Sequence, residues 1–462
     1  MNDSTTDSIS KRPLPETAAA MAAGKRLRDK VSRASHGLWR EPANRTDPIA
    51  TLHAGDATRL AELVPIRYGR MLVSPFTFYR GAAAVMAADL ALTPASGVRV
   101  QACGDAHLLN FGGFATPERR LVFDINDLDE TLPAPWEWDV KRLVASFVLA
   151  ARANGLARSA GHEAAIACAR SYRKRMRELM AMDVLDIWYS RIEHTDYLAM
   201  LPKDRRAALI ERIAKATAHP SSELVFPKLV EQEGAQHRIH DRPPLIFHAI
   251  EARHAGYLDE IKSALSAYRE TLPEDRRVLV GRMHLVDAAI KVVGIGSVGT
   301  LCMVLLFTTV AGHPFFLQVK EANASVLEPF AGASAYDHHG QRVVMGQRLM
   351  QSASDMFLGW VTGPKGRHFY LRQLRDAKLG ALVETFDAEM LEIYGKLCGW
   401  ALARAHAKAG DPWTIGGYLG NSEAFDDAMG EFGLAYADQA ERDHAALKKV
   451  VRLGKVPVDL ER

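Results

Sequence analysis

The sequence has 462 residues, of which 48% are hydrophobic and 24% are charged, the balance of an ordinary globular protein. The formal net charge of +3 is close to neutral for this length, and it gives no reason to expect nucleic acid or an anionic membrane as the main partner. The cysteines form no CxxC pair, so they suggest neither a zinc site nor a disulfide framework, and reduced thiols in a cytoplasmic protein are the simplest interpretation. They are Cys103, Cys168, Cys302 and Cys398.

The chain divides by composition into four parts. Residues 1–45 contain acids, proline and scattered basic residues without the apolar stretch of a secretory signal, and we predict a flexible tail. Residues 46–282 predict a helical lobe that carries catalytic and metal-binding loops and a helical insertion, and residues 376–462 predict helices that complete it. Between them, residues 283–375 have a strand-like pattern that predicts a small β-rich unit.

Apolar periodicity and turn residues place the elements within these parts. We predict short strands at 97–103 and 120–127 and helices at 80–92, 138–179 (with a break near Gly155), 244–272, 340–355 and 389–410. The segment from Lys291 to Lys320 has no charged residue between its ends, a length that would admit a membrane span. Glycines and a turn at 311–314 divide it into strand-length pieces, so we predict a glycine-rich turn followed by a β-hairpin.

The loop GDAHLLNFGG at 104–113 combines an acid, an amide and glycines, and a strand ending in acids follows it. Phosphoryl transfer from a nucleotide needs a carboxylate that accepts the proton of the substrate hydroxyl, and hard oxygen ligands for Mg²⁺. Four residues separate Asp105 from Asn110, a spacing with which one loop presents both groups to the same phosphate. We therefore predict Asp105 as the base and Asn110 and Asp124 as magnesium ligands, in the manner of the protein-kinase catalytic signature.

The same loop resembles that of the aminoglycoside phosphotransferase type of small-molecule kinases, which reads H-G-D-x-H-x-x-N. Here Cys103 replaces the first His, and the glycine after the metal-binding aspartate is missing, which leaves Asp124 and Asp127 both eligible as ligands. The resemblance implies that an aspartate opening the next helix braces the catalytic loop, and Asp139 fits that structural role. Within the loop, His107 is a candidate catalytic residue that orients Asp105 or contacts a phosphate. The plainer alternative is a turn whose Asp and Asn only satisfy local backbone groups.

A second motif, GIGSVG at 294–299, matches GxGxxG, which alone is a weak signal. In a dinucleotide fold a helix would follow, whereas here a strand, a turn and a strand ending near Lys320 follow. In kinases such a hairpin clamps the nucleotide, because backbone amides cover the phosphates and the lysine reaches them. The alternative for the lysine is an edge-strand side chain that extends to water. The residues predicted to bind ATP are Gly294, Gly296, Ser297, Gly299 and Lys320.

These motifs occur in the reverse of the kinase order, because the glycine turn follows the catalytic loop by about two hundred residues. We therefore predict an α+β, protein-kinase-like two-lobe fold that is circularly permuted, with a large, mostly helical lobe and a small β-rich nucleotide lobe. The helix at 340–355 would be the small-lobe helix and residues 374–380 the hinge. That helix offers no glutamate to pair with Lys320, so we name Glu328 as the partner.

Several stretches look like the bacterial family known only as domain of unknown function 2252. The resemblance covers nearly all of the chain after the tail, and the grouping of that family with kinase-like proteins agrees with the motifs above. Its name supplies no substrate. The stretches include RYGRM (67–71), SPFTFYRGAA (74–83), VVGIGSVGT (292–300), QVKEA (318–322) and YADQAERD (436–443).

The main hypothesis is an ATP- and Mg²⁺-dependent phosphotransferase that acts on an unknown small-molecule or protein acceptor, with neither nucleic acid nor membrane as partner. Transfer of AMP with the same groups, and a catalytically weak pseudokinase or nucleotide-binding module, are the alternatives. A metal-dependent hydrolase using His107 and the acid cluster is a third. Arg67, Arg70 and Arg80 are further candidates for contacts with phosphate or a substrate acid.

Overall fold

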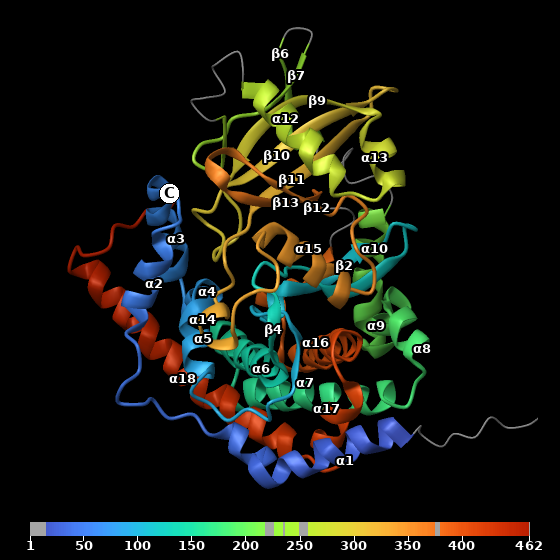
Figure 1. Cartoon of the computed structure of the whole chain (residues 1–462). Coiled ribbons are helices and arrows are strands. Elements are labelled where there is room, and N and C mark those ends of the chain that lie inside the picture. The colour runs from blue at the N-terminus through green and yellow to red at the C-terminus, as the bar shows by residue number, and fades with distance from the viewer. Residues whose placement is uncertain (1–14, 218–225, 234–235, 249–256, 375–378, 462) are drawn as a thin grey trace, which may run out of the picture.

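The computed structural model describes residues 15–217, 226–233, 236–248, 257–374 and 379–461 (Figure 1). In Figure 1 the strands of the largest sheet lie at the top and the long helices lie below them. The predicted α+β class is confirmed, since helices and several antiparallel sheets are both present.

Helix α6 (Trp136–Ala153) lies at the centre of the helical part, and every residue from Trp136 to Ala151 is buried. A helix that is buried on all sides needs neighbours on all sides. Three long helices pack around it. Two of these three come close to each other at Gly399, where a Cβ would lie 2.2 Å from the Cys168 carbonyl oxygen. These helices are α7 (Arg158–Leu179), α16 (Ala388–Ala409) and α18 (Ala424–Arg452).

The predicted tail is wrong from residue 15 onward, and residues 1–14 lie outside the described residues. Helix α1 (Pro15–Lys30) packs against α17 (Pro412–Leu419), and the Arg28 Nε donates to the Tyr418 carbonyl oxygen at 2.7 Å. The alanine-rich helix buries only a narrow stripe, which its polar composition conceals in the sequence. Four helices follow it: α2 (Pro48–Asp56), α3 (Val64–Leu72), α4 (Pro75–Gly81) and α5 (Ala83–Leu90).

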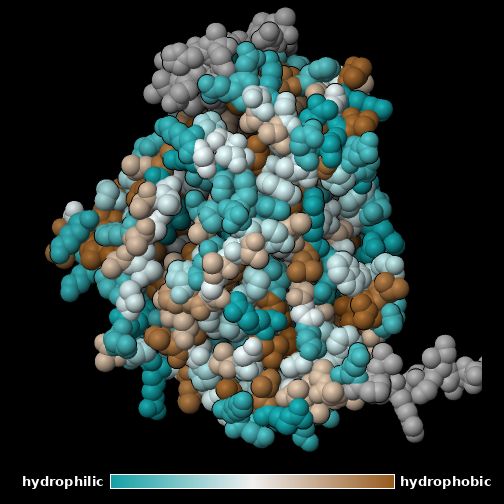
Figure 2. Space-filling view, viewed as in Figure 1, coloured by the Kyte–Doolittle hydropathy of each residue, from teal (hydrophilic) through white to brown (hydrophobic). Residues whose placement is uncertain are grey.

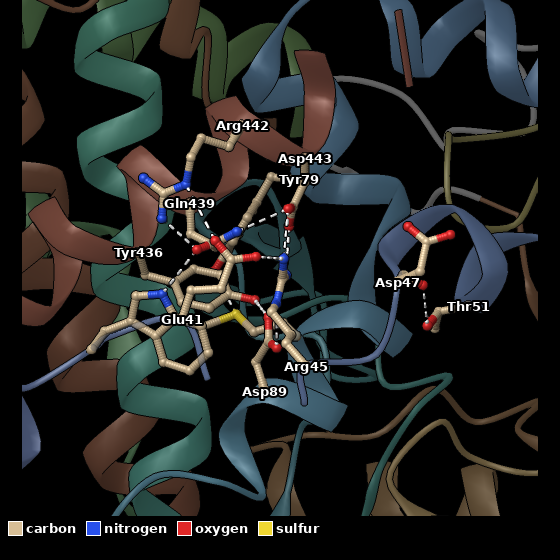
Figure 3. A network of polar contacts seen from close by, with 12 residues as sticks. Glu41, Arg45, Asp47, Thr51, Tyr79, Asp89, Tyr436, Gln439, Arg442 and Asp443 are labelled. Atoms are coloured by element: carbon tan, nitrogen blue, oxygen red, sulfur yellow. Dashed lines mark hydrogen bonds and ion pairs between the residues drawn. The ribbon is translucent and has the colours of Figure 1, made fainter. Parts of the chain in front are cut away.

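The segment before α2 is also fixed to the helical part, through a buried network of charged groups (Figure 3). Arg45 lies between two aspartates, with its Nη2 at 2.7 Å from Asp89 on α5 and 2.6 Å from Asp443 on α18. Tyr436 donates a hydrogen bond of 2.7 Å to Asp89. Burial of one cation between two carboxylates raises the pKa of Arg45, because the carboxylates outweigh its desolvation.

The β-rich part is a six-stranded antiparallel sheet in the order β12-β13-β11-β10-β9-β8. Helix α15 (His339–Met350) follows β11 in the chain and lies between this sheet and α16 (Figure 1). The predicted hairpin is therefore present, and the helix predicted at 340–355 is helical as far as Met350. The strands are β8 (Ile246–Phe247), β9 (Met283–Lys291), β10 (Cys302–Thr309), β11 (Pro314–Glu321), β12 (Gly359–Thr362) and β13 (His368–Gln373).

Alternation along β11 gives the sheet two different faces. Phe315, Leu317 and Val319 pack against α12 (Tyr257–Glu270) and α13 (Glu274–Val280), whereas Lys320 belongs to the opposite face. The small unit therefore begins earlier than residue 283, because α12, α13 and β8 belong to it. Of the helix predicted at 244–272, residues 246–247 are instead strand β8, residues 249–256 lie outside the described residues, and only the last part is helical.

Two smaller sheets carry the polar loop and the acids that follow it. The first pairs β1 (Arg99–Ala102) with β4 (Leu132–Pro135), and the second has the order β14-β2-β3-β5. The pairing of β2 with β3 opposes Phe111 to Ile125, which brings the end of the loop beside the acids. The second sheet consists of β2 (Phe111–Ala115), β3 (Leu121–Ile125), β5 (Ile192–Glu193) and β14 (Leu379–Gly380).

The remaining elements lie at the edges of both parts. Most of the predicted hinge, residues 375–378, lies outside the described residues. These elements are α8 (Val184–Tyr189), α9 (His194–Met200), α10 (Lys203–Thr217), β6 (Val230–Glu233), β7 (Gln236–Ile239) and α14 (Glu328–Ala331).

The uncharged segment 292–319 is folded into the sheet. Its two apolar runs are strands β10 and β11, which pair from Cys302 to Thr308. No helix in the described part of the chain is long and apolar enough to cross a membrane. On the face drawn in Figure 2, hydrophobic residues lie in small groups among hydrophilic ones.

Candidate active site

A cavity of about 650 Å³ lies between the six-stranded sheet and the helical part. From the sheet and its glycine-rich turn it is lined by Lys291, Gly294, Ser297, Gln318, Lys320 and Arg372. From the helical part and the small sheets it is lined by Arg80, Asn110, Asn126 and Asp127. The two motifs that lie far apart in the sequence thus border one space, whose size suits a small ligand.

The loop at 103–105 is held in place by Asp139, in the first turn of α6. One carboxylate oxygen accepts from the Cys103 amide at 2.6 Å and the other from the Gly104 amide at 2.9 Å. The His406 Nε2 lies 3.1 Å from the same carboxylate. Gly104 has a φ of +82°, and a Cβ there would lie 2.4 Å from the Glu130 carbonyl oxygen. Asp139 therefore braces the loop, as the sequence predicts.

Asp105 has a side chain that is 21% exposed, and it is not among the residues that line the cavity. Its Oδ1 lies 2.6 Å from the Nε and 2.5 Å from the Nη2 of Arg142 on α6. Its Oδ2 accepts no hydrogen bond from another described residue, and the His107 Nε2 lies 4.0 Å from it. One oxygen is therefore fixed by a buried cation, and the other remains able to accept a proton.

His107 lies behind the loop and does not line the cavity. Burial lowers its pKa to about 4, against the opposing effect of Asp105, so its ring is neutral at pH 7. The Nδ1 is buried and has no hydrogen-bond partner within the described residues. Of the two roles predicted for it, orientation of Asp105 fits this position better than contact with a phosphate.

Asn110 and Asp127 reach the cavity from neighbouring backbone segments. The Asn110 carbonyl accepts from the Asn126 amide at 2.7 Å, which ties the loop to the chain just after β3. The Asn110 Nδ2 donates to the Asp105 carbonyl oxygen at 2.7 Å, so the amide oxygen is the atom left over. The predicted meeting of loop and acid cluster is present, with Asp127 as its acidic member.

Asp124, which we predicted as a magnesium ligand, lies elsewhere. Its side chain is 0% exposed and it does not line the cavity. Both of its oxygens are hydrogen bonded to Arg404 on α16, at 2.7 and 2.9 Å, and Ser352 donates to it from its amide and hydroxyl. The structure therefore corrects the sequence-based assignment. Asp124 joins β3 to α16, and Asp127, whose side chain is 35% exposed, is the member of this acid cluster that lines the cavity.

Lys320 extends from β11 into the cavity, and its side chain is only 3% exposed. Its Nζ lies 3.4 Å from both oxygens of Asp127, forms an ion pair with Asp129, and lies 5.6 Å from the centre of the Tyr370 ring. Burial alone would lower the pKa of Lys320, but the two aspartates raise it well above its ordinary value. The alternative of an edge-strand lysine that reaches water is therefore wrong.

The glycine-rich turn between β9 and β10 is attached to the helical part. Its carbonyl oxygens accept from the Leu60 amide at 2.7 Å, from Arg59 at 2.5 Å and from Arg70 at 2.6 Å. The amides of Gly296 and Ser297 donate no hydrogen bond to another described residue. The turn thus uses carbonyls for attachment. Gly294 and Ser297 line the cavity, whereas Gly296 and Gly299, which the sequence also predicts to bind ATP, do not.

One comparison with known proteins gives a match. A family model described as an uncharacterized protein conserved in bacteria, DUF2252, matches residues 59–450. The chain belongs to the DUF2252 family. No curated protein and no solved structure matches it.

The matched region of this DUF2252 protein includes Glu328, which the structure does not bring to Lys320. The Glu328 carboxylate accepts from the Ser325 amide at 3.1 Å, at the start of the short helix α14. Asp127 and Asp129 take the place that we predicted for it. The facing position on α15 is occupied by Gln347, which is 2% exposed and lines the cavity.

The cavity of this DUF2252 protein also contains donors that the motifs did not reveal. Its lining includes five cationic side chains and two acidic ones, Asp127 and Asp355. Three buried donors among the lining residues have no partner within the described residues: Arg80 Nε, Asn126 Nδ2 and Gln347 Nε2. Buried donors are almost always paired, so the cavity fits an anionic ligand. The cations are Arg80, Arg119, Lys291, Lys320 and Arg372.

Proposed function

We propose that this protein is an ATP- and Mg²⁺-dependent phosphotransferase with a circularly permuted, protein-kinase-like arrangement of two lobes. The observation that carries the proposal is the distance of 3.4 Å between Lys320 Nζ and the Asp127 carboxylate, inside a cavity that the glycine-rich turn and Asn110 also line. Kinases use these residue types for nucleotide phosphates and magnesium.

The order of elements in the small part supports the same proposal. A strand, the glycine-rich turn, a strand and the lysine-bearing strand occur in succession, followed by helix α15 and two further strands of the same sheet. A protein kinase likewise places its Gly-rich loop before a lysine on the third strand and a helix after it. The whole unit follows the catalytic loop in the chain, as a permutation requires.

The residues of the cavity fit ATP and magnesium. The Asn110 amide oxygen and the Asp127 carboxylate are the hard oxygen ligands that Mg²⁺ prefers, and the ion ordinarily completes its shell with water and phosphate oxygens. No cluster of three His, Cys, Asp or Glu side chains suited to a metal occurs among the described residues. Bound there, magnesium would neutralise charge on the β and γ phosphates.

Each protein group then has one task. Asp105 accepts the proton of the acceptor hydroxyl through its Oδ2, while Arg142 holds its Oδ1. Lys320 and the amides of the glycine-rich turn bind the phosphates. His107 supports Asp105 from behind. Transfer of AMP would use the same groups with the nucleotide reversed, and a pseudokinase would use only the binding groups.

Two isotopic labels test the proposal. The protein is incubated with Mg²⁺ and either [γ-³²P]ATP or [α-³²P]ATP, with water and a bacterial metabolite extract as acceptors. We expect γ label to be transferred or released and α label to stay on the nucleotide, and Asp105→Asn to lower the rate at least about a hundredfold. Asp204→Asn, at a side chain 79% exposed on α10, is the control. Transfer of α label would show nucleotidyl transfer, and no turnover with retained binding would show a pseudokinase.

A further inference from the structure

Three arginines, at 67, 70 and 80, precede strand β1, and the structure separates them by their partners. Arg67 donates to Asp56 at 2.9 Å and to the Gly81 carbonyl at 3.0 Å. Arg70 pairs with Glu461 at 2.7 Å as well as holding the glycine-rich turn. Arg80 forms no hydrogen bond or ion pair with another described residue, although its Nε is buried. Arg67 and Arg70 therefore hold the structure together, whereas the guanidinium of Arg80 has no hydrogen-bond partner among the described residues.

Arg80 lies where the parts of the proposed site converge. Its side chain lines the cavity together with Asp127 and Ser297. Its own backbone approaches the glycine-rich turn, since a Cβ on Gly296 would lie 3.4 Å from the Arg80 carbonyl oxygen. Its charge also acts on the catalytic loop, because Asp105 favours the charged form of Arg80 against the desolvation that lowers its pKa. It therefore borders the magnesium side and the glycine-rich turn, and it lies within electrostatic range of the base.

The backbone that carries Arg80 is rigid. Helix α4 begins with a capping box in which Ser74 Oγ accepts from the Thr77 amide at 3.1 Å. The neighbouring Tyr79 donates a hydrogen bond of 2.7 Å to the Arg142 carbonyl oxygen, and Arg142 donates to the Tyr79 carbonyl. Tyr79 lies beside the buried network of Figure 3. The backbone next to Arg80 is thus tied to the arginine that holds Asp105, which favours preorganised charge stabilisation.

We propose that Arg80 binds the phosphoryl group during its transfer and stabilises the charge on its equatorial oxygens. This inference rests on the proposed function. In the reaction, the acceptor oxygen forms a bond to the γ-phosphorus and its proton passes to Asp105. The bond from the γ-phosphorus to the bridging oxygen breaks, and its electron pair stays on ADP. A guanidinium supplied within the same chain is one way in which phosphoryl transfer is accelerated. Lys320 binds the phosphates that remain on ADP.

Calorimetry with three probes separates this role from ordinary nucleotide binding. With Mg²⁺ present, the probes are ADP, ATP, and ADP with aluminium fluoride, which mimics the phosphoryl group in flight. We expect Arg80→Ala to leave ADP affinity within about twofold and to lower affinity for the aluminium fluoride complex at least about a hundredfold. Arg80→Lys, which keeps the charge without the planar fork, should fall between wild type and Arg80→Ala. Arg40→Ala, at an exposed residue before α2, is the matched control.

The outcomes distinguish this inference from the proposed function. If wild type binds all three probes and Arg80→Ala weakens ADP and the aluminium fluoride complex equally, Arg80 is a ground-state or structural residue and the inference falls alone. The same holds if Arg80→Ala changes neither affinity. If wild type binds no nucleotide, the proposed function falls and the inference with it. Thermal melting of each variant checks the fold, and Arg80→Lys supplies the result if Arg80→Ala does not fold.

Discussion

Asp124→Asn should mainly lower the stability of the protein, whereas Asp127→Asn should mainly lower its Mg²⁺-dependent affinity for ATP. Asp124 is fully buried and accepts from Arg404 at 2.7 and 2.9 Å and from the Ser352 hydroxyl at 2.8 Å. Removal of one member of a buried ion pair costs about 3–5 kcal/mol. Asparagine keeps one oxygen, so we expect Asp124→Asn to lower the free energy of unfolding by about 3 kcal/mol. Asp127 is one-third exposed, and its buried partner Lys320 keeps an ion pair with Asp129, so we expect Asp127→Asn to cost about 1 kcal/mol, less than Asp124→Asn.

Two assays read these effects separately. Urea denaturation gives the free energy of unfolding, and calorimetry gives the Mg²⁺-dependent part of ATP affinity. We expect Asp127→Asn to lose at least about tenfold in that affinity, equivalent to about 1.4 kcal/mol, and Asp124→Asn to keep it when folded. Asp204→Asn controls for the loss of a charge. The reasoning is refuted if Asp124→Asn loses Mg²⁺-dependent affinity at unchanged stability.

Three further changes test the surrounding structure. Asp139→Ala leaves the Cys103 and Gly104 amides without their acceptor, so we expect the free energy of unfolding in urea to fall by about 3 kcal/mol. A fall of less than about 1 kcal/mol would contradict this role of Asp139. Burial lowers the pKa of His36 to about 3, so between pH 6.5 and 3 the unfolded chain binds a proton that the folded chain does not. Stability should therefore fall by about 2 kcal/mol from pH 7 to pH 5 through this group, and His36→Gln should remove that part of the slope. An unchanged slope would contradict it. Gly299→Ala should destabilise the protein more than Gly312→Ala. Both glycines have positive φ, but only at Gly299 would a Cβ meet another side chain, that of Arg59, at 2.9 Å. Equal melting temperatures of the two variants would argue against this.

Local patterns in the sequence predicted the parts of the fold that depend on nearby residues. The polar loop at 104–113, the brace by Asp139, the glycine-rich turn between two strands and the strand carrying Lys320 all follow from short stretches with a distinctive composition. Alternation along β11 even places Lys320 on the face away from α12. Such features are set by turn chemistry and by the period of a strand.

The errors concern contacts between distant segments. Asp124 and Asp127 differ little in local sequence, and only the approach of Arg404, 280 residues later, buries the first. The same applies to Lys320, whose partners proved to be Asp127 and Asp129 rather than Glu328. Long-range pairing leaves no local pattern in one sequence.

Helix α1 and the placement of α12 and α13 were not predicted correctly, for a related reason. Helix α1 has few large apolar residues, and its packing on α17 gives the order that its composition does not suggest. The sequence places α12 and α13 with the preceding helices, whereas they pack on the six-stranded sheet. An amphipathic pattern predicts that a helix buries one face but does not show which element covers that face.

The measurement that tests the account most directly is ATP binding by calorimetry, with and without Mg²⁺, on wild type, Lys320→Met and Asp127→Asn. The account predicts Mg²⁺-dependent binding by wild type, a loss of at least about tenfold in each variant, and no change in an Asp204→Asn control. Such a result would make the glycine-rich hairpin and the acid cluster two sides of one nucleotide site. Absence of binding by folded wild type at millimolar ATP would contradict the account, and the cavity would then need an anionic ligand of another kind.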